Sequence, residues 1–502
     1  MTLSYLIRMI RYANPRDCSL IFPRISSQLG GVEEPMQKRI QLVSAVLTLT
    51  LALSTAIVPA AAEPSSKVFV TNSNDAGSGS FREAIEQANA NPAITRIQIQ
   101  GGVSTIALRQ MVLFTGTQDL TIDGNRATLD GANAGGPAFR TTGGSDLAVS
   151  NLTVRNAPAE GIAVEVPPDA TGVIHVSLFK VDIIDNRGHG VLVNDQEDPT
   201  TTEGVQPNAN GSAASLEVSV VNTRFIGNGY SVSDRDGLRV NEGGEGDLII
   251  AIKHSLAQNN AADGIEVDER GEGDVRVDMF GSHVTGNGQF DSDDLDDGFD
   301  IDEYDDGSIV GTIFSSSANN NYEEGFDFNE NNTGDLRVDM KDVAANGNGE
   351  EGIDYEEDDD FAGGGDLVTM MVDITANGNG VNNDGDAGLK IREKGVGDLN
   401  AELDRVKTSS NHIGGISVRE DDAGNIVSSI AAATSLANTE RGIDFDENGN
   451  GNLTATVSKS TSLTNGADDI RADEASVGDG TLFLSRVTYG TIGGNVDPII
   501  LR

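Results

Sequence analysis

The sequence contains no tryptophan, one cysteine and only 5% aromatic residues among its 502 positions. So few aromatic side chains argue against the large interlocking core that a single globular domain of this length would need. The one cysteine is Cys18, so the chain after residue 62 can form no disulfide, thiolate metal site or cysteine nucleophile. Many exported domains depend on disulfides, and this chain must obtain its stability from packing and hydrogen bonding.

Basic residues are also scarce. Removing the six basic and three acidic residues of positions 1–62 from the totals of 34 and 79 leaves 28 basic and 76 acidic residues, a net charge of −48. Nucleic-acid binding needs basic patches, so we expect no nucleic-acid partner. The same negative field would repel a polyanionic polysaccharide unless cations lie between the two.

Long apolar runs are missing except near the N-terminus. Two basic residues precede the apolar residues 42–58, and three alanines follow them. This order is typical of a secretory signal peptide, so we expect residues 1–62 to be a leader and the protein to be secreted, periplasmic or at the cell surface. A transmembrane anchor is the alternative, because the run approaches spanning length. The start codon is open between Met1 and Met36, and we expect no membrane span after the leader is removed.

Glycine, in contrast, is abundant, with 60 residues, and much of it recurs at a fixed spacing. An acidic-Gly-apolar-x-apolar segment is repeated along the chain, and its successive glycines are spaced by 27, 34, 27, 27, 36, 27, 27 and 27 residues. The two long intervals are insertions of seven and nine residues into a 27-residue period. A period this regular indicates a solenoid of stacked units. The glycines are Gly237, Gly264, Gly298, Gly325, Gly352, Gly388, Gly415 and Gly442, and Asp469 stands at this position in the ninth copy.

Each repeat predicts three short strands. The strand after the glycine alternates apolar and polar residues, a Gly-Asp or Gly-Asn step opens a second alternating strand, and a third strand ends on an asparagine. Three strands and three turns make one coil of an all-β parallel β-helix. We expect an N-terminal cap and first coils over residues 63–159, repeated coils over 160–495 and a tail over 496–502.

Asparagine follows the third strand in every intact copy, at Asn260, Asn287, Asn321, Asn348, Asn379, Asn411, Asn438 and Asn465. Coils of a β-helix lie about 4.8 Å apart, so equivalent amides can hydrogen-bond along the stack. Asparagine also tolerates the left-handed backbone of a sharp turn.

Glutamate lies five residues after each repeat position, at Glu242, Glu269, Glu303, Glu330, Glu357, Glu393, Glu420, Glu447 and Glu474. Like charges about 4.8 Å apart repel by roughly 0.9 kcal/mol per pair even in water. Two explanations are open: each carboxylate accepts backbone N–H groups of its own turn and extends into solvent, or cations lie between coils.

The segment before the repeats has a different pattern. Residues 81–90 (FREAIEQANA) predict a short amphipathic helix that covers the open end of the solenoid. The stretch 71–90 resembles the opening segment of exported bacterial right-handed parallel β-helix proteins of the pectate-lyase-like superfamily, and 120–131 and 146–156 resemble its early coils. The resemblance covers about residues 66–495 and implies a right-handed parallel β-helix of about 12 coils. It implies no single activity, because this fold serves lyases, hydrolases, epimerases, tailspikes and adhesins.

The resemblance also implies where an enzymatic groove would lie, which is along the strand opened by Gly-Asp. Pectate-lyase-like enzymes use an arginine as base beside carboxylate-bound Ca²⁺, so the weak catalytic candidates are Arg276, Asp278, Arg337 and Asp339. Ordinary ion pairing between coils would produce the same spacing. No catalytic motif of the family matches, and no catalytic role can be transferred.

Acidic residues occupy the outward positions of the glycine-led strand on four successive coils. The predicted metal ligands are Glu266, Asp268, Asp300, Asp302, Asp327, Asp354 and Glu356, and acidic insertions over 291–306 and 355–361 flank them. Hard oxygen ligands on one face suit Ca²⁺, which is the expected cofactor, with diffuse counterion binding as the alternative.

The uniform repeat favours an exported, non-catalytic surface or carbohydrate-binding protein. Its expected partner is an extracellular polysaccharide or a cell-surface component. The alternative is a Ca²⁺-dependent polysaccharide lyase or epimerase acting on uronate polymers.

Overall fold

The computed structural model describes residues 66–501, apart from 196–210, 231–233, 290–295, 359–363, 383–386 and 475–477. The expected leader and parts of both acidic insertions lie outside the described residues. Within them, no helix has the length and apolar character needed to cross a membrane.

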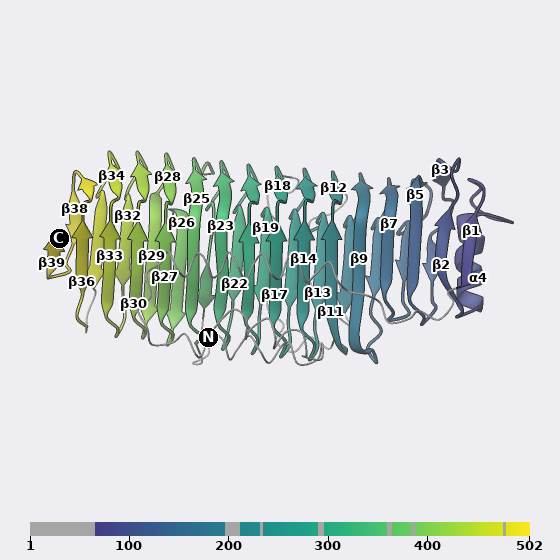
Figure 1. Ribbon diagram of the computed structural model, residues 1–502, viewed down its shortest axis with the longest axis horizontal. Coiled ribbons are helices and arrows are strands. Elements are labelled where there is room, and N and C mark those ends of the chain that lie inside the picture. The colour runs from purple at the N-terminus through teal and green to yellow at the C-terminus, as the bar shows by residue number, and fades with distance from the viewer. Residues whose placement is uncertain are drawn as a thin grey trace, which may run out of the picture. The chain divides into compact units, whose positions relative to one another are not determined.

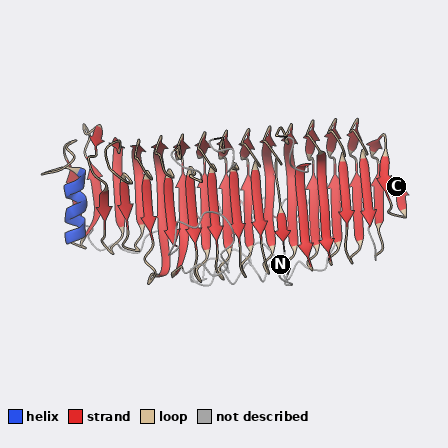
Figure 2. Cartoon of the chain, turned by 180° about the vertical axis from the view of Figure 1, so that it is seen from behind, coloured by secondary structure: helices blue, strands red, loops and turns tan. Residues whose placement is uncertain are grey.

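The described chain is a right-handed parallel β-helix, which confirms the predicted fold class. Its strands form two sheets, of 25 and 14 strands, and the strands of both stack on one another in chain order (Figure 1). The glycine-led strand of each coil belongs to the 14-stranded sheet, and the other two strands of the coil belong to the 25-stranded sheet. Seen from behind, the described part is strands and connecting loops except for the helix α4 (Phe81–Ala90) at one end (Figure 2).

The 14-stranded sheet consists of β4 (Val112–Phe114), β6 (Phe139–Thr141), β8 (Ile162–Glu165), β10 (Val191–Asp195), β13 (Leu238–Glu242), β16 (Ile265–Glu269), β19 (Phe299–Glu303), β22 (Phe326–Glu330), β24 (Glu356–Asp358), β26 (Ala387–Gly395), β29 (Gly414–Asp422), β32 (Ile443–Glu447), β35 (Ile470–Glu474) and β38 (Ile492–Gly494).

The 25-stranded sheet consists of β1 (Ser66–Val70), β2 (Ile94–Ile99), β3 (Thr105–Ala107), β5 (Leu120–Asp130), β7 (Leu147–Arg155), β9 (Thr171–Ile184), β11 (Ala213–Val221), β12 (Arg224–Ile226), β14 (Leu248–Lys253), β15 (Leu256–Gln258), β17 (Val275–Phe280), β18 (His283–Thr285), β20 (Ile309–Phe314), β21 (Ser317–Asn319), β23 (Leu336–Asn346), β25 (Leu367–Asn377), β27 (Leu399–Asp404), β28 (Lys407–Ser409), β30 (Ile426–Ala431), β31 (Thr434–Leu436), β33 (Leu453–Ser458), β34 (Thr461–Leu463), β36 (Thr481–Ser485), β37 (Thr488–Tyr489) and β39 (Ile499–Leu501).

The predicted helix is confirmed as α4 (Phe81–Ala90). The Ser80 hydroxyl at its N-cap accepts the N–H of Glu83 at 3.1 Å, and the Glu83 carboxylate reaches back to accept the N–H of Gly79, the residue before the N-cap, at 2.6 Å. Its buried face packs against β1, β2 and β4. The helix therefore closes the apolar core at the first coil.

The asparagine column is confirmed as a buried amide ladder. The Asn260 side-chain N–H donates to Asn287 Oδ1 at 3.0 Å, and Asn287 in turn donates to Asn321 Oδ1 at 3.0 Å. The expected left-handed backbone falls one residue earlier: Asn259 and Asn320 have φ of 52° and 57°, while the ladder asparagines do not. The ladder position therefore needs asparagine for its amide and not for its backbone.

Asp469 closes this ladder at its C-terminal end, where the glycine column stops. Its Oδ1 accepts the Asn465 side-chain N–H at 2.9 Å and the Asn465 backbone N–H at 3.2 Å. A carboxylate thus takes the place of the next amide oxygen, which explains the departure of the ninth copy from glycine.

The glycine column leaves no room for a side chain. A Cβ on Gly264 would lie 2.5 Å from the carbonyl oxygen of Gly298 and 2.7 Å from Asn287 Nδ2. We expect Gly264→Ala to destabilise the protein by about 2–4 kcal/mol, because neither neighbour can move aside. Denaturant unfolding measures this, with Gly136→Ala as the control: the nearest atom to that Cβ lies 4.0 Å away, and the change should stay within about 0.5 kcal/mol. Equal losses in the two variants would contradict the steric explanation.

The glutamate column lies inside the protein, and the explanation that these side chains extend into solvent is wrong. Eight members, from Glu242 to Glu447, are 0% exposed. The first half of that explanation holds for several of them: Glu330 Oε1 accepts the N–H of Gly334 at 2.9 Å, and Glu393 Oε1 accepts that of Gly397 at 3.0 Å. The column turns inward because these N–H groups belong to the turn that leads from one sheet to the other.

Candidate functional site

The acidic run is defined here as Glu266, Asp300, Asp327 and Asp354, the residues two positions after the repeat glycine on four successive coils. Strand register places Glu266 opposite Asp300 and Asp300 opposite Asp327. Bridges of Ile353 to Phe326 and to Leu389 carry the same register on to Asp354 and Lys390. The run therefore forms one column on the outer face of the 14-stranded sheet.

Cationic side chains close the run at both ends. Arg239 lies in register before Glu266 and places Nη1 2.6 Å from Glu266 Oε2. At the other end, Lys390 Nζ lies 2.7 Å from Asp354 Oδ2. Within the described part of the chain, no lysine or arginine comes within 4 Å of the carboxylates of Asp300 or Asp327. The negative charge in the middle of the run is thus left without a protein counterion.

A second acidic column runs beside the first, at the position just before each glycine. Asp263 Oδ1 accepts the backbone N–H of Asp297 at 2.6 Å, and Asp297 Oδ1 accepts that of Glu324 at 2.6 Å. One oxygen of each aspartate therefore joins neighbouring coils.

The two columns converge into clusters with the geometry of a cation site. One ligand oxygen each from Asp297, Asp300 and Asp327 lie within 4.8 Å of one another, and the same holds for Asp263, Glu266 and Asp300. Ca²⁺ binds oxygen ligands at 2.3–2.6 Å, so an ion between such oxygens would reach all three. Further clusters join Asp234 and Asp236 to Glu266, Glu323 and Glu324 to Asp297, and Glu351 to Glu324 and Asp354.

Two observations set these clusters apart from ordinary exposed acids. Asp300 Oδ1 and Asp327 Oδ1 are inaccessible to solvent, yet neither receives a hydrogen bond from the described residues. Burial, followed by the charges of neighbouring aspartates, raises the pKa of Asp297, Asp300 and Asp327 well above the usual value. Without a cation, burial and mutual repulsion disfavour the charged form of these carboxyl groups.

The remaining predicted ligands are held by protein groups. Asp268 Oδ2 lies 2.8 Å from Arg270 and 3.1 Å from Arg239. Glu356 Oε1 lies 2.6 Å from Lys390, and Asp302 accepts the hydroxyl of Tyr304 at 2.5 Å. Burial and the nearby Asp268 raise the pKa of Asp302 to about 6, and burial raises that of Asp354 to about 8 although Lys390 opposes it.

The weak catalytic candidates do not form a joint site in the described structure. Arg276 and Asp278 lie on β17, and Arg337 and Asp339 lie on β23, with β20 paired between them. Asp278 accepts the Thr312 hydroxyl at 2.6 Å, while Arg337 lies 2.8 Å from Asp335. Asp339 accepts the N–H of Met370 at 2.9 Å, and burial raises its pKa to about 6. No hydrogen bond or ion pair among the described residues joins two of the four.

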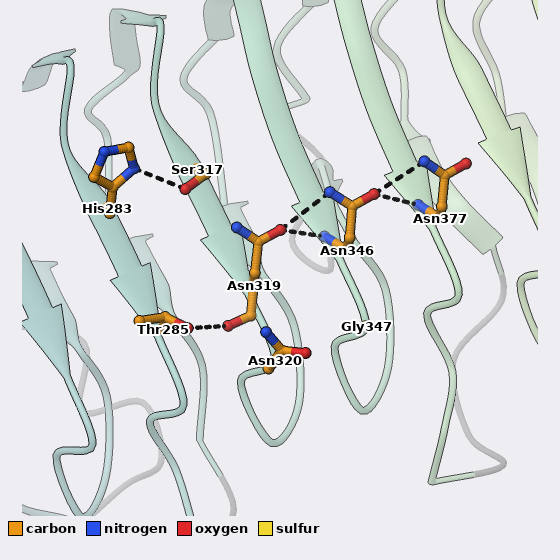
Figure 3. A pocket seen from close by; sticks show the side chains of 8 residues that line it. All are labelled: His283, Thr285, Ser317, Asn319, Asn320, Asn346, Gly347 and Asn377. Carbon is orange, nitrogen blue, oxygen red and sulfur yellow. Dashed lines mark hydrogen bonds between the residues drawn. The ribbon is translucent and has the colours of Figure 1, made fainter.

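The 25-stranded sheet carries a second polar feature, an amide hollow of about 600 Å³ lined by His283, Thr285, Ser317, Asn319, Asn320, Asn346, Gly347 and Asn377. Its centre is an outward asparagine ladder, shown in Figure 3: Asn346 donates to Asn319 Oδ1 at 3.1 Å, and Asn377 donates to Asn346 Oδ1 at 3.0 Å. His283 Nδ1 lies 2.8 Å from the Ser317 hydroxyl. None of the residues that line the hollow carries a carboxylate.

The sequence analysis included the acid before the glycine in the repeat but did not identify it as a ligand, and it missed the outward asparagine ladder, although both features leave a pattern. The acid before the glycine recurs as Asp236, Asp263, Asp297, Glu324 and Glu351 on the coils of the acidic run. The outward ladder recurs as Asn-x-Asn at 319–321, 346–348 and 377–379, where the second asparagine belongs to the buried ladder. Aligning the repeats column by column would have exposed both.

Comparison with protein-family models and with curated proteins finds no match for this chain. Among solved structures, the crystal structure of pectate lyase Pel9A is similar, with 17% sequence identity and a TM-score of 0.42 over 63% of this chain and 80% of that chain. With an identity and a TM-score this low, the similarity assigns no activity to this chain.

Proposed function

We propose that this protein is an exported, non-catalytic β-helix that binds Ca²⁺ on its acidic face and carbohydrate or a surface component on its exterior. The observation that carries the proposal is the acidic run, whose ends are neutralised by Arg239 and Lys390 and whose centre at Asp300 and Asp327 is not. If the run served only solubility, its carboxylates would be solvated. Instead, they are drawn together into clusters with buried, unpartnered oxygens.

The ligands match the chemistry of Ca²⁺ in kind. Each cluster supplies three carboxylate oxygens within 4.8 Å of one another, and water could complete the coordination shell. Softer metals prefer nitrogen or sulfur ligands. The clusters consist of carboxylates alone, and cysteine is missing after residue 62.

The amide hollow supports the carbohydrate part of the proposal. Side-chain amides both donate and accept hydrogen bonds, as sugar hydroxyl groups do. The hollow crosses successive coils on β18, β21, β23 and β25, so an extended chain laid along the stack would meet a hydroxyl and a histidine on the first coil and an amide on each of the next three. Its neutral lining favours an uncharged glycan over a uronate polymer, which the surrounding acids would repel.

A glycan that binds the natural protein should bind the Asn346→Ala variant about tenfold more weakly, because a central amide of the hollow is lost. A panel of soluble glycans screened against the purified protein, with and without Ca²⁺, identifies the glycan, and calorimetry measures the change. Asn425→Ala is the matched control, because Asn425 belongs to another outward ladder, with Asn452 and Asp398. If no glycan of the panel binds the protein, or if the two substitutions weaken binding equally, the proposal that the hollow binds carbohydrate is contradicted.

The lyase or epimerase alternative makes a different prediction on the same sample. Release of unsaturated uronates from pectate or alginate in the presence of Ca²⁺ would overturn the non-catalytic proposal. Loss of that release in Arg276→Ala or Arg337→Ala would then identify the base.

A further inference from the structure

The C-terminal half of the glutamate column lies apart from the acidic face and raises a separate question. Glu393 and Glu420 lie within β26 and β29, Glu447 is the last residue of β32, and all three are 0% exposed. The charged groups that face Glu420 are Glu393 and Glu447. Glu357 faces Glu393 from one side, and Glu474, with Asp479 beside it, faces Glu447 from the other. No lysine or arginine forms an ion pair with these glutamates in the described chain.

Their hydrogen-bond donors are distributed unequally. Glu447 Oε1 accepts the N–H groups of Gly449 at 2.9 Å and Gly451 at 3.0 Å, which stabilise a carboxylate. Neither oxygen of Glu420 receives a hydrogen bond of normal geometry, although the Gly424 N–H lies nearby. Glu420 is therefore the member least suited to carry a buried negative charge.

The neighbouring carboxyl groups are within hydrogen-bonding reach of one another, Glu420 with Glu447 and Glu393 with Glu420. Two oxygens can meet in this way only if a proton or a cation lies between them. Two charges about 4.8 Å apart would otherwise repel strongly, because the effective dielectric constant of a buried site is low. An O–H···O⁻ hydrogen bond removes this repulsion and is stronger than a neutral one.

We propose that this part of the column is a row of proton-binding sites, in which Glu420 is a neutral carboxylic acid at neutral pH and donates its hydrogen to the carboxylate of Glu447. Burial, followed by the adjoining glutamates, raises the pKa of Glu393 to about 9 and that of Glu420 to about 9. Burial also acts on Glu447, but hydrogen bonds from Glu474, Glu420 and two glycines bring its pKa below the usual value. The change from acid to acceptor therefore falls between Glu420 and Glu447, where the two glycine N–H groups supply the donors.

The raised pKa of Glu420 determines how the stability of the fold changes with pH. A carboxyl group with a raised pKa binds more protons in the folded state than in the unfolded state, so unfolding at neutral pH releases them. The stability that the proton provides is complete below the ordinary pKa near 4.5 and is lost as the pH rises through about 9.

Counting protons tests this directly. The full chain is unfolded by denaturant at pH 7 in weak buffer with an indicator dye, and the protons released per molecule are compared between variants. We expect Glu420→Gln to release about one proton fewer than the natural sequence, because its amide has no proton to lose. Glu440→Gln, at an exposed glutamate, is the matched control and should release the same number as the natural sequence.

Equal proton release from Glu420→Gln and the natural sequence would overturn the proposal. So would a metal ion that survives dialysis against a chelator in the natural protein and is missing from Glu420→Gln, since the column would then hold a metal. Glu393→Gln provides the same test one coil earlier if Glu420→Gln does not fold. Because these residues lie outside the acidic run, failure here leaves the Ca²⁺ proposal standing, and the converse also holds.

Discussion

Millimolar Ca²⁺ should raise the thermal unfolding midpoint of this protein far more than NaCl of equal ionic strength. A ligand that binds only the folded state at one hundred times its Kd stabilises that state by about 2.7 kcal/mol per site. Screening by NaCl weakens repulsion between exposed charges but does little for the partly buried carboxylates of the acidic run. Differential scanning calorimetry in matched Ca²⁺ and NaCl solutions measures the difference, and equal shifts would reduce the effect to charge screening.

The double variant Asp300→Asn, Asp327→Asn should abolish most of this Ca²⁺-dependent increment. In calcium-free buffer it should match or exceed the stability of the natural protein, because two buried like charges are removed. A merely structural role for these residues would instead lower stability in both buffers. Asp444→Asn is the matched control: Asp444 occupies the same repeat position, but Arg441 at 2.9 Å and Arg471 at 3.3 Å already neutralise it.

The second large effect is expected from the buried asparagine ladder. Asn287→Ala leaves the backbone and side-chain N–H groups of Asn260 without their common acceptor, and Asn321 loses one donor. Each buried polar group left unsatisfied costs about 1–3 kcal/mol, so we expect a loss of about 3–5 kcal/mol. Denaturant unfolding provides the measurement.

The control for the ladder is Asn452→Ala. Asn452 makes the same kind of bond, donating to Asn425 Oδ1 at 2.9 Å, but its side chain is exposed. Water can replace that bond, so the expected loss is about 0.5 kcal/mol. Similar losses at Asn287 and Asn452 would show that burial of the ladder does not determine its contribution.

The features that the sequence predicted well are those that repeat. The 27-residue period, the asparagine column and the alternation of apolar residues each recur many times, and the geometry of stacking permits one solution for all of them. The helix α4 was predictable for a different reason, because its capping residues and apolar face are local.

The glutamate column shows where such reasoning fails. A repeat gives the position of Glu420 in the coil, but not the side of the turn to which its carboxylate points. Glutamate is rarely buried without a partner, which made solvent the natural expectation. The structure turns it inward because the backbone N–H groups of the turn point there.

The sequence predicted the acidic face, but it did not predict which of the acids pair with basic side chains and which do not. Which acids are neutralised depends on Arg239 and Lys390, which lie in the same column as the acids but on the coils before and after them. Reading the repeat across coils, and not only along the chain, separates Asp300 and Asp327 from paired residues such as Asp268. Strand register decides which residues of the adjacent coils lie beside an acid, and so whether that acid has a basic partner. A search along the sequence alone does not reveal this.

The most direct test of the Ca²⁺ site is an anomalous diffraction map from crystals grown with Ca²⁺. We expect one peak among the carboxylates of Asp297, Asp300 and Asp327, at 2.3–2.6 Å from their oxygens, and a second peak among those of Asp263, Glu266 and Asp300. A map without peaks along the acidic run, with these carboxylates turned away from one another, would contradict it.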